Sequence, residues 1–81
     1  MKKMKYIIVD NGMYDTPIIF DEATNHSDMA AAVPGKVVSA GFVVFRPTGL
    51  ECYGHSVSLE IKSAGEVDSK LINKMLGVDD D

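Results

Sequence analysis

A long apolar run, Val37–Phe45, does most to constrain the fold of this chain. Successive side chains of a β-strand point to opposite faces of a sheet, and here apolar residues occupy both alternating positions. This pattern predicts a central strand over Lys36–Arg46 that is buried on both sides for part of its length. Gly41, in the middle of the run, indicates either a β-bulge or an element that approaches the backbone closely.

Two further strands are expected before this run. Met4–Val9 is rich in β-branched and aromatic residues, and Thr16–Phe20 is a second short strand of the same kind. The turn residues Asp10–Gly12 between them predict a hairpin with a loop of five or six residues. Because Pro17 has no backbone N–H, it either places the second strand at the edge of the sheet or marks that strand's first residue.

Two strands are also expected after the run. Pro47–Gly49 is a turn, and Leu50–Tyr53 is expected to pair back across it. Residues Ser56–Lys62 alternate between apolar and polar, with Val57, Leu59 and Ile61 predicted to point inward.

Local signals predict two helices. The first is short and begins near Asn25, with Thr24 or Ser27 as competing caps; Pro34 and Gly35 end it. The second begins with a capping box formed by Ser63 and Glu66 and ends at Gly77. Its apolar residues recur at helical spacing and form one face: Val67, Leu71, Ile72, Met75 and Leu76.

The order of these elements, β-β-α-β-β-β-α, predicts a small α+β protein. We expect an antiparallel, meander-like sheet of about five strands with both helices packed on one face, a single domain over residues 1–78, and a short acidic tail over residues 79–81. If the other face stays open, either Phe42 with Val44 or Val43 with Phe45 is left uncovered. Such an apolar patch predicts a homodimer.

Composition limits where such a protein can work. The chain has 81 residues, a net charge of −4 and a single cysteine, Cys52, which is typical of reducing compartments. No secretory signal is visible, because the first apolar run after Lys3 is short and is broken by Asp10 and Asn11. No run approaches the length that spans a bilayer. The sequence therefore predicts a soluble, cytoplasmic protein.

The charges are unevenly distributed. Residues 6–35 contain no lysine or arginine but five carboxylates: Asp10, Asp15, Asp21, Glu22 and Asp28. An acidic surface of this kind repels nucleic acid and favours a basic protein partner. The simpler interpretation, that acidic residues have gathered in loops and at a helix start, stays open.

Few residues suggest chemistry. Cys52 and His55 form a C-x-x-H pair, and His26 and Asp28 form H-x-D, but neither spacing matches a common zinc framework. Cys52 could be a nucleophile with either histidine as its base. Because Cys52 shares a parity with Leu50, it is better interpreted as a small buried hydrophobic residue. We therefore predict no metal and no catalytic residue, with a small Cys/His-dependent enzyme or ligand-binding protein as the alternative.

Nucleotides and nucleic acids are not expected ligands. The seven glycines form neither G-x-G-x-x-G nor G-x-x-x-x-G-K-[ST], so no cofactor is predicted. The tyrosines and phenylalanines could stack on bases, but the lysines and arginines that accompany such a surface are lacking.

Three segments, taken in order, carry a resemblance. They are N-H-S-D-M-A (Asn25–Ala30), S-A-G-F-V (Ser39–Val43) and C-Y-G-H-S-V-S-L (Cys52–Leu59). Their order and approximate spacing resemble short uncharacterised proteins encoded by bacteriophages and prophages. The resemblance implies a viral accessory protein that acts in bacterial cytoplasm, and it carries over no catalytic residue.

The function expected from the sequence is therefore protein binding without enzymatic activity. The expected partner is a bacterial host protein with a basic surface, such as a defence or nucleic-acid-binding factor that the acidic surface would inhibit. The residues expected to contact it are Asp15, Asp21, Glu22, Asp28, Phe42 and Phe45. A structural, homo-oligomeric component of a phage assembly is a further alternative.

Overall fold

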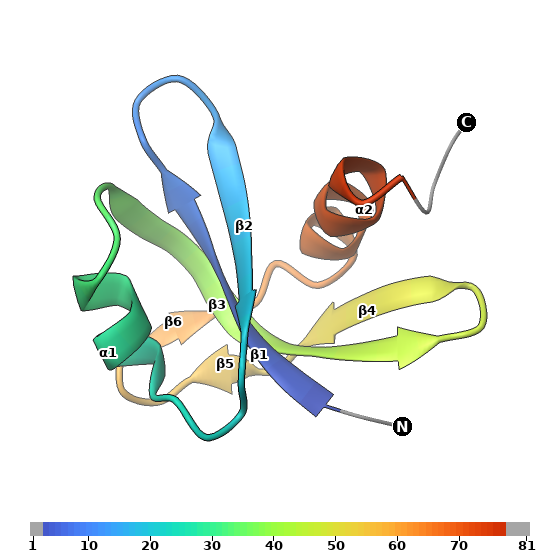
Figure 1. Cartoon of the computed structure of the whole chain (residues 1–81), viewed down its shortest axis with the longest axis horizontal. Coiled ribbons are helices and arrows are strands. Elements are labelled where there is room, and N and C mark those ends of the chain that lie inside the picture. The colour runs from blue at the N-terminus through green and yellow to red at the C-terminus, as the bar shows by residue number, and fades with distance from the viewer. Residues whose placement is uncertain (1–2, 78–81) are drawn as a thin grey trace.

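A four-stranded antiparallel sheet is the centre of the structure, a computed structural model that describes residues 3–77 (Figure 1). The strands lie in the order β2-β1-β3-β4, where β1 is Lys3–Asp10, β2 is Asp15–Phe20, β3 is Lys36–Arg46 and β4 is Gly49–Tyr53. The long β3 occupies an inner position, as its apolar run predicts. The edge position predicted from Pro17 is also confirmed, because β2 is an outer strand. The α+β class is confirmed as well, with two helices beside the sheet.

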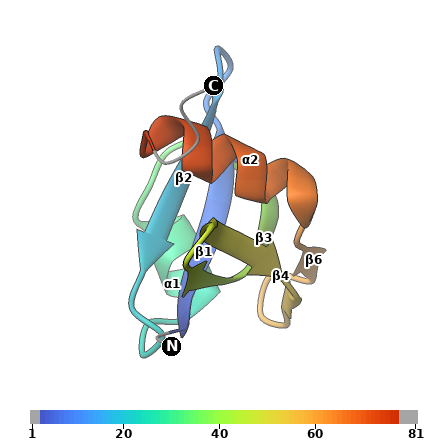
Figure 2. The same cartoon turned by 90° about the vertical axis from the view of Figure 1, so that its right-hand side faces the viewer.

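The helices cover opposite faces of the sheet, so the prediction that both pack on one face is wrong. Helix α1 is His26–Ala31 and helix α2 is Glu66–Met75. Figure 2 shows α2 in front of the sheet and α1 behind it. Below, the α1 face and the α2 face are the two sides of the sheet that these helices cover. The reason lies in the inner strands, β1 and β3. Apolar residues occupy consecutive positions in these strands and so point to both faces of the sheet, and each face must be covered.

Each face has its own apolar core. The α2 face buries Tyr6, Ile8, Val43, Leu50, Cys52 and Ile72. The α1 face buries Ile7, Val9, Phe20 and Ala40, with Met29 and Val33 packed against them from α1 and the residues after it. Neighbouring residues of β1 thus belong to different cores.

Gly41 marks a close approach rather than a bulge. A Cβ atom at Gly41 would overlap the carbonyl oxygen of Tyr53 and would lie 3.1 Å from Cβ of Ser63. Only glycine lets the chain that follows β4 pass so near to β3. The register of β1 against β3 shifts instead between Ile8 and Val9, which pair with Ser39 and Val37, so the extra residue is Val38.

The predicted strand over Ser56–Lys62 is wrong. The segment forms β5 (His55–Ser56) and β6 (Ile61–Lys62), a separate two-stranded ladder joined by a tight turn. Inside that turn the Leu59 N–H donates to Ser56 Oγ, and Glu60 takes a φ of 55°. A serine hydroxyl that satisfies a nearby N–H offers the backbone an alternative to a strand. Val57, predicted to point inward, is therefore exposed.

The helix boundaries follow the sequence only in part. Asn25 precedes α1 as its N-cap residue, although its side chain makes no capping hydrogen bond. The capping box predicted for α2 is wrong, because the N-cap is Gly65, with a φ of 59°. Ser63 lies two residues earlier, and its Oγ accepts the Gly65 N–H. Gly77 follows the last turn of α2 with a φ of 75°, in agreement with its predicted role.

Within residues 3–77, no helix is long and apolar enough to cross a membrane. The predicted acidic tail, residues 79–81, lies outside the described part of the chain.

Candidate functional site

The Cys52 side chain lies in the α2-face core, with 4% of its surface exposed. The pKa of this thiol is raised to about 11, mainly by burial and to a lesser extent by the negative charge of Asp68, whereas a hydrogen bond with Ser69 acts against the shift. The thiolate is the reactive form of cysteine, so this thiol is poorly nucleophilic at neutral pH. The interpretation of Cys52 as a buried core residue is confirmed.

The two histidines lie on the other side of the sheet. His26 packs edge-on against Phe20 and Phe42, with ring centroids 5.5 and 5.7 Å apart, and its Nε2 lies 2.8 Å from the carbonyl oxygen of Gly41. His55 lines the same hollow as His26 and Phe42. The sheet therefore separates both rings from Cys52, and the Cys/His arrangement considered as the alternative is not formed. No group of three or more His, Cys, Asp or Glu side chains among residues 3–77 is placed to hold a metal ion.

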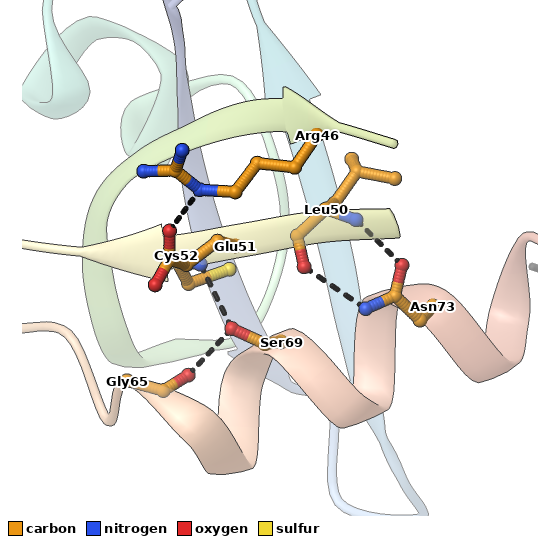
Figure 3. Close-up of polar contacts among 7 residues, drawn as sticks. All are labelled: Arg46, Leu50, Glu51, Cys52, Gly65, Ser69 and Asn73. Carbon is orange, nitrogen blue, oxygen red and sulfur yellow. Dashed lines mark hydrogen bonds and ion pairs between the residues drawn. The ribbon is translucent and has the colours of Figure 1, made fainter. Parts of the chain in front are cut away.

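Beside Cys52, side chains of α2 close the outer edge of β4 (Figure 3). The Leu50 N–H donates to Asn73 Oδ1 at 2.8 Å, and Asn73 Nδ2 donates to the Leu50 carbonyl at 2.9 Å. Two residues further along β4, the Cys52 N–H donates to Ser69 Oγ, which itself donates to the Gly65 carbonyl. An edge strand normally presents such groups to solvent or to another chain. Here the helix occupies them, so this edge is part of the scaffold.

A buried polar cluster joins α2 to the centre of the sheet. Oη of Tyr6 lies 2.5 Å from Asp68 Oδ2 and 2.5 Å from Ser63 Oγ. Asp68 Oδ2 also accepts the Ala64 N–H at 2.9 Å. Burial raises the pKa of Tyr6, and the hydrogen bond to the Asp68 carboxylate raises it further, so the phenol stays protonated and donates. The sequence analysis did not identify this cluster. Asp68 precedes Leu71, Ile72 and Met75 at helical spacing, so its place on the apolar face of the helix was a usable signal.

The α1 face carries a partly exposed aromatic pair. Phe42 and Tyr53 pack with ring centroids 5.9 Å apart, and 41% of Tyr53 is exposed. Lys3 Nζ lies 4.7 Å from the centre of the Phe42 ring, within cation–π range, and 3.2 Å from Glu22 Oε2. We call these four residues, Lys3, Glu22, Phe42 and Tyr53, the Phe42 face.

The predicted acidic surface divides into two groups. Asp15 pairs with Asp10 at the loop end of the first hairpin, beside Lys36, which pairs with Asp10 from β3. Asp21 follows the other end of β2. It lies six residues after Asp15, which corresponds to about 20 Å along an extended strand. All of these acids are exposed. The surface predicted from residues 6–35 is thus not of one sign, because lysines from elsewhere in the chain lie beside both groups.

The second acidic group lies next to the Phe42 face. Asp21 Oδ1 accepts the Ala23 N–H at 3.0 Å, which fixes the turn that carries Glu22. Asp28 is exposed on α1, two residues after His26 and hence about 200° around the helix from it. Glu22 is joined to Phe42 through Lys3, whereas Asp28 projects from the opposite side of α1.

Phe42 and Phe45 lie on opposite faces. Phe45 pairs with Leu50 at the end of the α2 face, and 43% of it is exposed. Phe42 is half-buried between His26 and Tyr53. The six residues predicted to bind a partner therefore do not form one surface. The structure joins Glu22 to Phe42, places Asp21 next to Glu22 in the chain, and separates Asp15 and Phe45 from them.

The lysines beside this site were not identified from the sequence. Lys3 and Lys5 alternate with Met4 in β1, and this spacing places both on the α1 face. Lys5 pairs with Phe42, and Phe42 pairs with Tyr53 on its other side, in one row across the strands. The alternation of side chains along β1 would have placed Lys3 and Lys5 on the same face. Which residues lie beside them in neighbouring strands depends on the register between segments far apart in the sequence.

Comparison with known proteins gives no relative. No protein-family model matches the chain, and neither the curated proteins nor the solved structures contain a match.

Proposed function

We propose that this protein acts without enzymatic activity, by binding another protein through the Phe42 face. The observation that carries the proposal is the partly exposed pair of aromatic rings, Phe42 and Tyr53, with the Lys3–Glu22 ion pair at its border. Aromatic side chains surrounded by polar and charged groups are the usual anchors of protein interfaces.

Charge indicates the kind of partner. Asp21 and Glu22 are exposed beside the aromatic pair, and the chain carries a net charge of −4. A basic side chain of the partner would approach Glu22 in place of Lys3, so a partner with an arginine- or lysine-rich surface fits best. Together with the resemblance to phage-encoded proteins, this supports a bacterial, cytoplasmic partner that itself binds nucleic acid and is inhibited by this protein.

Charge reversal tests the proposal. The variant Asp21→Lys/Glu22→Lys changes two acids beside the Phe42 face, and Asp10→Lys/Asp15→Lys makes the same change at the other end of the sheet. A partner retained from bacterial lysate should be lost with the first variant, most clearly at low salt, and kept with the second. Equal retention by both variants, or loss with the second alone, would contradict the proposal.

A second proposal concerns self-association, as in a structural phage component. We propose a homodimer through Phe45, the large exposed side chain at the end of the α2 face. Light scattering should give a dimer mass for the native chain and a monomer mass for Phe45→Ser. A monomer mass for both chains at high concentration would remove this proposal.

A further inference from the structure

A hollow of about 370 Å³ opens next to Phe42, between the start of α1 and the β5–β6 ladder. Its walls include His26, Lys5, Phe42, His55, Val57 and Ser58. We propose that this hollow binds a small aromatic carboxylate whose ring carries an N–H group. This volume is toward the lower end of the range for small-molecule sites, roughly 300–1,000 Å³, which suits a ligand of one or two rings.

His26 supplies the acceptor for the ring N–H. The side chain is buried, with 4% of its surface exposed, and Nε2 lies 2.8 Å from the Gly41 carbonyl. A carbonyl oxygen only accepts, so Nε2 carries the proton, and Nδ1 of the neutral ring holds a free lone pair. Burial lowers the pKa of His26, which favours this neutral form.

The Nδ1 lone pair receives no hydrogen bond from residues 3–77. None of the buried side-chain nitrogens or oxygens in this part of the chain lacks a partner. Nδ1 is therefore not fully buried, and because His26 lines the hollow, we infer that a ligand there reaches this atom. A neutral imidazole held in one tautomer selects a ligand group that donates a hydrogen bond.

Lys5 supplies the positive charge for the carboxylate. Its Nζ donates one hydrogen bond, at 2.8 Å, to the carbonyl oxygen of Thr24, and an ammonium group has three N–H donors. Two donors thus remain for a ligand, on a side chain that is half-buried and already fixed in position. Charge-assisted hydrogen bonds from such a group are stronger than neutral ones.

Phe42 and Val57 supply the apolar walls. Val57 is 78% exposed although it is apolar, and it lines the hollow together with Phe42. A flat ligand body would remove both from water, which is favourable in proportion to the apolar area covered.

Three probe molecules separate these contacts on the native chain. Indole-3-carboxylate has both groups, 1-naphthoate lacks the ring N–H, and indole lacks the carboxylate. In ¹H–¹⁵N spectra we expect indole-3-carboxylate to give saturable shifts of Lys5, His26 and Val57, with affinity at least about fivefold higher than either other probe. Absence of saturable shifts, or equal affinity for all three probes, would overturn the proposal.

Two variants assign each contact to its residue. His26→Gln keeps an amide nitrogen near the position of Nε2 for Gly41 but removes the Nδ1 acceptor, so its preference for indole-3-carboxylate over 1-naphthoate should disappear. Lys5→Met should remove the preference over indole, and Lys74→Met, which changes an exposed lysine on α2, should keep both preferences. Unchanged preferences in His26→Gln and Lys5→Met would contradict the assignment. Because these titrations need no protein partner, their outcome is independent of the function proposed above.

Discussion

The two faces of the sheet use polar residues in different ways. On the α2 face, polar side chains pair with each other or with the backbone, as Tyr6 does with Asp68 and Asn73 with Leu50. On the α1 face, the aromatic pair is partly exposed, and His26 and Lys5 keep free hydrogen-bonding capacity. Paired groups in a core hold a fold together, whereas unpaired capacity at a surface is available to a ligand. The polar groups of the α2 face therefore act as scaffold, and those of the α1 face are available to bind other molecules.

The largest effect is expected from the apolar anchor of α2. Ile72 is fully buried, so Ile72→Ala should lower the free energy of unfolding by about 3 kcal/mol, through lost apolar burial and a cavity. Leu76→Ala, at the C-cap of the same helix and 57% exposed, is the matched control and should change it by less than about 0.5 kcal/mol. Urea unfolding measures both. Similar losses for the two variants would mean that α2 is not anchored as described.

A somewhat smaller loss is expected at Asp68. Asp68→Ala leaves the Ala64 N–H without its acceptor and leaves the Tyr6 hydroxyl with Ser63 Oγ alone, which should cost about 2 kcal/mol. Glu66→Ala removes an exposed acid from the same turn and should have little effect. In the Tyr6→Phe background the cost of Asp68→Ala should shrink, because the hydrogen bond between the two side chains is already gone. An unchanged cost there would show that the two side chains are not coupled.

Thiol chemistry sharpens the contrast without perturbing the fold. The pKa of Cys52 is raised from 9.0 to about 11, so at pH 8 the thiolate is about 100-fold less abundant than in a free cysteine. Alkylation of the native protein should be slower by at least that factor and should still accelerate above pH 10. Denaturant should remove the difference. Rapid alkylation of the native chain at pH 8 would show that the α2-face core is open.

The smallest expected effect is a pH dependence from His26. Burial lowers the pKa of its ring in the folded state, so below pH 6.5 the unfolded chain binds a proton more readily than the folded one. Stability from the neutral ring is therefore complete above pH 6.5 and is lost as the pH falls toward the folded pKa. His26→Gln should flatten the stability curve between pH 6.5 and 5. A curve of the same slope in both proteins would assign the dependence to other groups.

The sheet and the α2 face could be predicted from the sequence better than the candidate binding site on the α1 face. The apolar run of β3 and the edge position of Pro17 follow from side-chain alternation and from a missing N–H, which are local properties. The prediction that both helices pack on one face was wrong, although the apolar residues at both alternating positions of β3 already required cover on both sides. Reasoning also missed the turn in the 56–62 segment, where a serine hydroxyl competes with the ladder.

The candidate site depends on contacts that no local pattern contains. Lys3 meets Glu22 only because β1 and β2 pair antiparallel, so that the start of β1 lies beside the turn after β2. Phe42 meets Tyr53 through the register of β3 against β4. Charge counted along the chain gave one acidic surface, but folding places lysines beside its two halves.

One matched pair of substitutions tests the central claim most directly. Tyr53→Ser and Phe45→Ser each remove one aromatic side chain of similar exposure, 41% and 43%, from the α1 and α2 faces respectively. The affinity of a retained partner should fall by about tenfold or more with Tyr53→Ser, as for an interface anchor, and should stay unchanged with Phe45→Ser. A loss confined to Phe45→Ser, or no loss with either variant, would contradict the assignment of binding to the Phe42 face.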